Sequence, residues 1–69
     1  MNISTEEKKA LKEMRITLAL AWFKTYADNR KKGMPKEKAN VEGYTFINGK
    51  AFTMEEVKTL EKLIDRLLK

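Results

Sequence analysis

The chain has 69 residues, of which 36% are charged and 42% hydrophobic, with no cysteine, no histidine and a net charge of +5. This composition predicts one small folded domain, residues 1–69, and excludes disulfides, thiolate metal sites and histidine-based catalysis. The basic excess lies in residues 1–33, which hold eight basic and four acidic side chains. Such an excess favours an anionic partner: nucleic acid, a membrane surface or an acidic protein.

The sequence shows no targeting or membrane-spanning segment. Residues 1–12 carry charges of both signs and lack the apolar centre of a signal peptide. The longest apolar run, residues 18–23, is too short to cross a bilayer. We therefore expect a cytoplasmic protein without a membrane span.

Residues 5–32 are predicted to form one long helix. Ser4 and Glu7 match the S-x-x-E capping box, in which a hydroxyl and a carboxylate bind free amides at the helix start. Gly33 suits the left-handed position that closes a helix, and Pro35 follows as a stop. At about 1.5 Å per residue this helix is about 42 Å long, although a compact 69-residue domain is only about 28 Å across.

This helix has two apolar stripes, and a small monomer needs only one. At the helical period Leu11, Met14, Leu18, Ala21 and Trp22 fall on one stripe, and Ile16, Leu20, Phe23 and Ala27 fall roughly opposite. The sequence does not say which stripe is internal, so both supply candidates for self-association: Leu11, Met14, Leu18, Trp22, Ile16, Leu20 and Phe23. The alternative is a helix that kinks or ends near Asp28-Asn29, with its own chain covering both stripes.

The second half of the chain predicts a loop, a hairpin and a helix. Residues 33–43 are polar and lack a clear hydrophobic period, which indicates a surface loop. In residues 44–53, Asn48-Gly49 favours a type I′ turn that pairs Ile47 with Lys50. Tyr44, Phe46 and Ala51 should then share one face of the hairpin, and Ile47 and Phe52 the other.

Residues 54–68 are predicted to form the last helix. Thr53 and Glu56 form a second capping box, and one apolar face follows, made of Val57, Leu60, Leu63, Ile64, Leu67 and Leu68. The expected fold is therefore mostly α with a small β-hairpin, in the order α-β-β-α. The long N-terminal helix should pack against the shorter, antiparallel C-terminal helix, with the hairpin across them or at one end.

Basic side chains on one side of the long helix are the candidate anion or nucleic-acid contacts. Lys8, Lys12, Arg15, Tyr26 and Arg30 share a narrow strip, with Trp22 at its border, and basic groups with interleaved aromatics can bind phosphates and stack on bases. A second basic cluster comprises Arg30, Lys31, Lys32, Lys36 and Lys38. The structural alternative is that these side chains cover an apolar stripe with their methylene stems and cap the helix end.

No catalytic, cofactor or metal-binding motif is present: the paired carboxylates lie in first turns, and the three glycines do not form a phosphate loop. We therefore expect a non-enzymatic protein without cofactor or metal, which self-associates and acts as an adaptor or inhibitor through a surface on a macromolecular partner. Two alternatives remain open. One is a basic nucleic-acid-binding module, and the other is a nucleotide-binding or phosphorylated-ligand-binding protein with its site between protomers.

Overall fold

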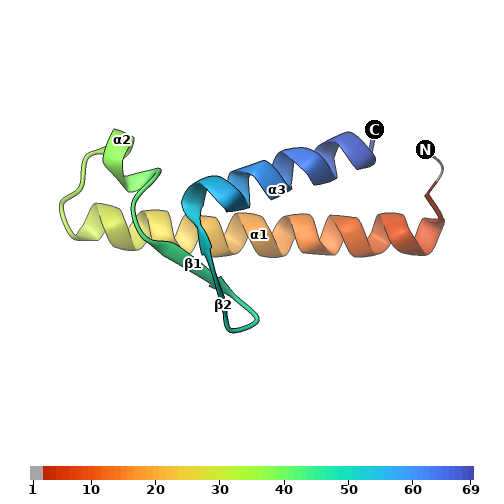
Figure 1. Cartoon of the computed structure of the whole chain (residues 1–69), viewed down its shortest axis with the longest axis horizontal. Coiled ribbons are helices and arrows are strands. Elements are labelled where there is room, and N and C mark those ends of the chain that lie inside the picture. The colour runs from red at the N-terminus through yellow and green to blue at the C-terminus, as the bar shows by residue number, and fades with distance from the viewer. Residues whose placement is uncertain (1–2) are drawn as a thin grey trace.

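The computed structural model describes residues 3–69 and is mostly helical, with one antiparallel hairpin (Figure 1). Its elements are α1 (Thr5–Lys31), α2 (Lys36–Ala39), β1 (Tyr44–Ile47), β2 (Lys50–Thr53) and α3 (Met54–Leu67). The predicted fold class is confirmed: a long N-terminal helix packs against a shorter C-terminal helix, and the hairpin lies between these two helices in the sequence. The predicted range 1–69 includes two residues that lie outside the described part.

Both predicted capping boxes are present. At the start of α1 the Ser4 hydroxyl accepts a hydrogen bond from the Glu7 amide at 3.1 Å, and the Glu7 carboxylate accepts one from the Ser4 amide at 2.9 Å. These bonds from Ser4 hold the pKa of Glu7 below its usual value. Thr53 and Glu56 make the same pair of bonds at the start of α3.

The C-terminus of α1 closes with a Schellman motif. Lys32 is the cap, and Gly33 follows with a φ of +93°. The Gly33 amide donates to the Arg30 carbonyl, and the Met34 amide donates to the Asn29 carbonyl, so two carbonyls that the helix leaves free are bound. The helix therefore continues through Asn29, and the alternative of an early end at that point does not apply.

The segment predicted as a loop, residues 33–43, contains the one-turn helix α2, and this part of the prediction was wrong. Pro35 is its N-cap, and Ala39 is completely buried. The side-chain amide of Asn29 donates to the carbonyls of Ala39 at 3.1 Å and Glu42 at 2.8 Å, which fixes the segment against α1. A single turn is too short to give the helical repeat that sequence analysis relies on.

The hairpin has the predicted register and turn. Ile47 pairs with Lys50, and the turn residues Asn48 and Gly49 have φ angles of 52° and 78°, as a type I′ turn requires. The face that carries Ile47 and Phe52 packs against the core between α1 and α3. The hairpin lies across α1 and projects beyond it on the side away from α3 (Figure 1).

A hydroxyl pair joins the hairpin to the long helix. The buried Thr45 hydroxyl of β1 donates to the Thr25 hydroxyl of α1 at 3.1 Å, and Thr25 donates to the Ala21 carbonyl at 3.3 Å. The polar atoms of Thr45 are therefore satisfied although its side chain is inside, so its burial carries little desolvation cost.

The core lies between α1 and α3, which run antiparallel, so that the start of α1 and the end of α3 lie at the same end of the molecule (Figure 1). Leu18, Val57 and Ile64 form its centre, and six further apolar side chains pack around them: Leu11, Trp22, Ile47, Phe52, Leu60 and Leu68. Leu63, which the apolar pattern placed on the core face of α3, is exposed instead.

The molecule is elongated because α1 is much longer than its partners. Its dimensions are 44 × 22 × 14 Å, and its radius of gyration of 13.5 Å exceeds the value of about 11 Å expected for a compact chain of this length. One long side of α1 thus receives α3 and, near the C-terminal end of α1, also α2, while the hairpin crosses another side (Figure 1). Within residues 3–69, no helix has the length and hydropathy needed to cross a membrane.

Candidate functional site

The structure shows which apolar stripe of α1 is internal. Leu18 is buried, and Leu11 and Trp22 pack against the core, so these three candidates for self-association serve the fold instead. Met14, on the same stripe, is 57% exposed, because it lies at the edge of the stripe beside the hairpin. The sequence could not separate the two stripes, since each has the helical spacing of a core face.

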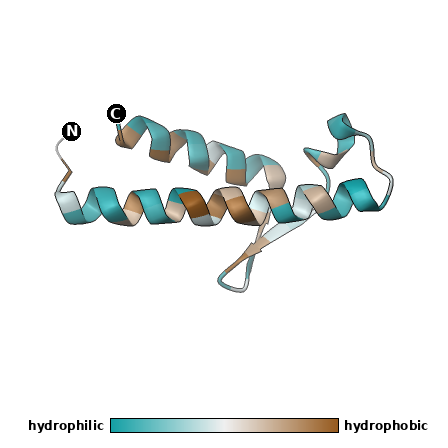
Figure 2. Ribbon diagram, turned by 180° about the vertical axis from the view of Figure 1, so that it is seen from behind, coloured by the Kyte–Doolittle hydropathy of each residue, from teal (hydrophilic) through white to brown (hydrophobic). Residues whose placement is uncertain are grey.

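The opposite stripe is solvent-exposed. Ile16, Leu20 and Phe23 are 59%, 67% and 63% exposed, and together they form what we call the outer face. Figure 2 shows that hydrophobic residues are concentrated in the middle of α1, with hydrophilic residues toward both ends. A cluster of large apolar side chains on one helix face is the feature that most distinguishes this surface from that of an ordinary small monomer.

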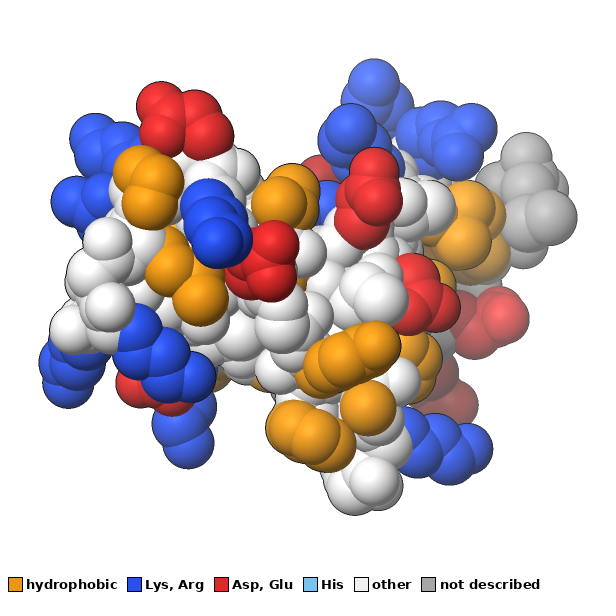
Figure 3. Space-filling view, turned by 60° about the vertical axis from the view of Figure 1, so that its left-hand side comes forward, with side chains coloured by type: hydrophobic (Ala, Val, Ile, Leu, Met, Phe, Trp, Pro, Cys, Tyr) orange, Lys and Arg blue, Asp and Glu red, His pale blue; other side chains and the backbone are white. Residues whose placement is uncertain are grey.

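A second exposed apolar area lies on the hairpin. Tyr44 and Phe46 are 61% and 70% exposed, and Ala51 beside Phe46 is exposed as well. Figure 3 shows hydrophobic side chains on the lower part of the molecule, where the hairpin projects. The predicted division of the hairpin into two faces is therefore confirmed, and the aromatic face is the one that points to solvent.

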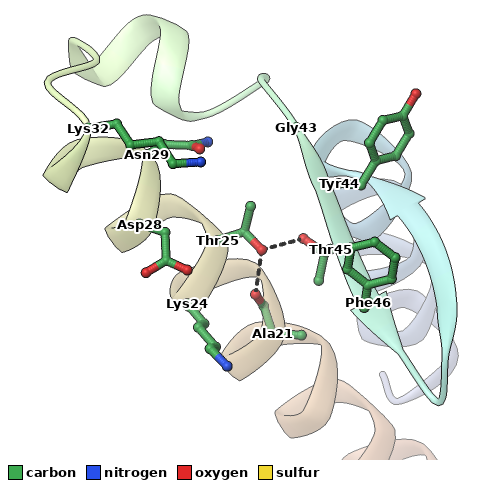
Figure 4. Close-up of a pocket in the computed structure, with 10 residues that line it drawn as sticks. All are labelled: Ala21, Lys24, Thr25, Asp28, Asn29, Lys32, Gly43, Tyr44, Thr45 and Phe46. Atoms are coloured by element: carbon green, nitrogen blue, oxygen red, sulfur yellow. Dashed lines mark hydrogen bonds between the residues drawn. The ribbon is translucent and has the colours of Figure 1, made fainter.

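Between these two areas runs a groove of about 330 Å³, bounded by α1 and β1 (Figure 4). Lys24, Asp28 and Lys32 line its helical wall, while Tyr44 and Phe46 line the other. The Thr25–Thr45 hydrogen bond crosses it. Lys24 and Asp28 share one side of the helix by their spacing, but no local pattern indicates that two aromatic rings would lie opposite them.

The predicted basic strip is interrupted at Arg15. Its guanidinium forms ion pairs with Glu61 and, at 3.0 Å, with Asp65, both on α3. The hydrogen bond to Asp65 raises the pKa of Arg15 further above its usual value. Glu61 is 4% exposed, so Arg15 provides a charge that a buried carboxylate requires, and it is not free to bind a phosphate.

Two other members of the strip also have partners within the fold. Tyr26 stacks on Trp22 with ring centroids 5.3 Å apart, and the Lys58 ammonium lies 4.1 Å from the centre of the Trp22 ring. Tyr26 and Lys58 therefore occupy surface of the Trp22 ring on which a base would stack. Lys8 and Lys12 remain exposed at the N-terminal end of the strip.

The basic cluster at the other end of α1 is exposed but mixed with acidic groups. Arg30 donates to the Met34 carbonyl at 3.3 Å, which stabilises the turn after the helix, while Lys31 and Lys32 are exposed. Lys36 and Lys38 lie on α2 together with Glu37. Figure 3 shows basic and acidic side chains interspersed over this end of the molecule, so no uniform positive field is formed.

The features described so far are exposed surfaces and a groove. Within residues 3–69, no three acidic side chains converge as metal ligands. Comparison of the chain with protein-family models, with curated proteins and with solved structures gave no match. The exposed outer face and the adjoining groove are thus the features on which a functional proposal must rest.

Proposed function

We propose that this protein is a non-enzymatic binding protein that self-associates and acts as an adaptor or inhibitor by occupying a surface on a macromolecular partner. The observation that carries the proposal is the exposure of Ile16, Leu20 and Phe23 on one face of α1. Burying a large apolar side chain contributes about 1.5–3 kcal/mol, so covering all three would provide a substantial driving force for association.

The hairpin supports the second part of the proposal. Tyr44 and Phe46 lie on a different element from the outer face, so a second surface remains when the first is occupied. Aromatic residues are enriched at the centres of protein interfaces, because they bury much area at a low cost in side-chain entropy. Two such surfaces on one small chain are what an adaptor or inhibitor requires.

The competing nucleic-acid function has less support. Arg15 is paired with acidic groups, Trp22 contacts Tyr26 and Lys58, and Glu37 lies between Lys36 and Lys38 on α2. A phosphate-binding surface needs basic groups that are free to replace counterions.

Sedimentation equilibrium over a range of protein concentrations tests self-association. We expect a dimer or larger species at micromolar concentration, and the double variant Leu20→Gln/Phe23→Gln should be monomeric under the same conditions. Met14→Gln is the matched control, because it removes an exposed apolar side chain outside the outer face. A parent protein that stays monomeric at every concentration would contradict the proposal.

A photo-cross-linking amino acid at position 46 tests for the partner. We expect a discrete adduct with another macromolecule in a native cell extract. The same group at Lys62, an exposed position on α3, should give none. Adducts of the chain with itself alone at position 46 would contradict the adaptor or inhibitor role while leaving self-association in place.

A further inference from the structure

The outer face belongs to a longer pattern that runs along nearly all of α1. Exposed and half-exposed residues recur at alternating intervals of three and four, a pattern that we call the seam: Glu6, Lys9, Glu13, Ile16, Leu20, Phe23, Ala27 and Arg30. Intervals of three and four are those at which two long helices pack against each other side by side. The 27 residues of α1 make a surface about 40 Å long.

On the flank of the seam that adjoins the groove, the charges have opposite signs in the two halves of α1: Glu6 and Glu13 lie before the apolar centre, and Lys24 and Lys31 lie after it. The other flank is basic in both halves, with Lys12 before the centre and Arg30 after it. The helix dipole favours the same distribution, but it acts only on the first and last turns and therefore does not account for Glu13 or Lys24.

We infer that the seam pairs with the seam of a second copy of this chain, with the two α1 helices antiparallel. This inference rests on the proposed self-association and specifies its geometry. A two-fold axis near Leu18–Ala19 sets Ile16 beside the partner's Leu20 and Glu13 beside the partner's Lys24. The same axis brings Glu6 to the partner's Lys31.

The two contacts that pair opposite charges in this arrangement are Glu13 with the partner's Lys24 and Glu6 with the partner's Lys31. Opposite charges across an interface fix register and orientation more than they raise affinity.

A parallel pair has the opposite electrostatics. Each residue of the seam would then face its own copy, so that Glu13 meets the partner's Glu13 and Lys9 meets the partner's Lys9. Like charges that face each other in a helix pair are destabilising. The charge distribution therefore selects the antiparallel orientation.

Charge reversal at one contact tests this geometry. Glu13→Lys and Lys24→Glu should each weaken the dimer about ten-fold, because each places like charges at two symmetric contacts. The double variant Glu13→Lys/Lys24→Glu restores opposite charges and should bring the dissociation constant back to within about two-fold of the parent's. Affinities are measured by sedimentation or by dilution of fluorescently labelled protein.

The control variants change the net charge by the same amount, but at positions outside the seam. Lys62→Glu on α3 and Glu42→Lys after α2 are exposed positions and should leave the dissociation constant unchanged. Lysine and glutamate have similar helix propensities, so the helix content of the Glu13 and Lys24 variants should match that of the parent. Their melting temperatures should match the parent's at a protein concentration where all are monomeric.

Three results would overturn the antiparallel seam. One is a dimer that neither single variant weakens, as a parallel pair or another interface would give. Another is a double variant weaker than both single variants. The third is a dimer that also survives Leu20→Gln/Phe23→Gln, which would leave self-association in place at a different surface. A monomeric parent, in contrast, would remove the proposed function itself.

Discussion

Asn29 has a structural role that its position near the end of a helix does not reveal. Its amide nitrogen is bound to two backbone carbonyls from the segment that connects α1 to the hairpin. The side chain is 4% exposed, and it is polar, so the two hydrogen bonds are needed to offset its desolvation. The contact makes residues 39–42 part of the packed structure.

Asn29→Asp should therefore destabilise the protein. The substitution keeps the size of the side chain but places a carboxyl oxygen against two carbonyls, and a buried polar group without a partner costs about 1–3 kcal/mol, or more when charged. Chemical denaturation measures the loss, with Asn40→Asp as the control at an exposed position. Equal stability of the two variants would mean that the two hydrogen bonds contribute nothing.

Asn29 and Arg15 show why single residues were the hardest to assign from sequence. Arg15 was expected at an anion-binding surface, but its partners Glu61 and Asp65 lie about fifty residues further along the chain. Asn29 was expected only as a possible helix end. Partners of this kind depend on how the helices are packed, and no spacing within one helix carries that information.

Elements with local signals were predicted well. The two capping boxes and the Schellman glycine depend on residues three to four positions apart, and the Asn48-Gly49 turn needs only two neighbours. The hairpin register followed from the turn alone. The helix α2 was missed because its single turn is stabilised by the contact with Asn29 and not by a pattern of its own.

The turn itself offers a test at the level of the hairpin. Gly49 has a φ of +78°, and a β-branched residue at that angle is strained, so Gly49→Val should lower stability by about 1–3 kcal/mol. Nothing lies within 4 Å of the position of an added Cβ, and the cost would therefore come from the backbone. The neighbouring substitution Lys50→Val, on a strand, should be tolerated in the same melting experiment. Similar melting curves for Gly49→Val and the parent would contradict a type I′ turn.

At the scale of the whole molecule, the sequence left open which of the two apolar stripes of α1 faces the core. Two stripes with the same period are equivalent until α3 and the hairpin are placed, and their placement is a tertiary property. The structure assigns Leu18 to the core and leaves Leu20 outside. The same packing pairs Arg15 with Glu61 and Asp65, so the two apolar stripes predicted for self-association narrow to the outer face, and the alternative basic strip loses one of its members.

Nucleic-acid binding should consequently be weak and unselective. We expect filter binding of the parent to be low at physiological salt and to rise at low salt, since the exposed lysines still attract phosphates. Lys31→Gln/Lys32→Gln should lower the salt slope by about 0.7–0.9 per lost contact. Arg15→Gln should mainly lower stability, because the buried Glu61 loses the nearer of its two ion-pair partners and keeps only Lys58 at 3.8 Å. Tight and sequence-selective binding at physiological salt would favour the nucleic-acid alternative.

The junction between the hairpin and α3 has a mechanical consequence. Thr53 is both the last residue of β2 and the N-cap of α3, so no linker residue separates the strand from the helix. Its two bonds with Glu56 fix the angle at which the helix leaves the sheet. A partner that binds the aromatic face and tilts the hairpin would therefore change the orientation of α3 as well. Such a change would strain the ion pairs of Arg15 with Glu61 and Asp65, which are remote from the point of binding.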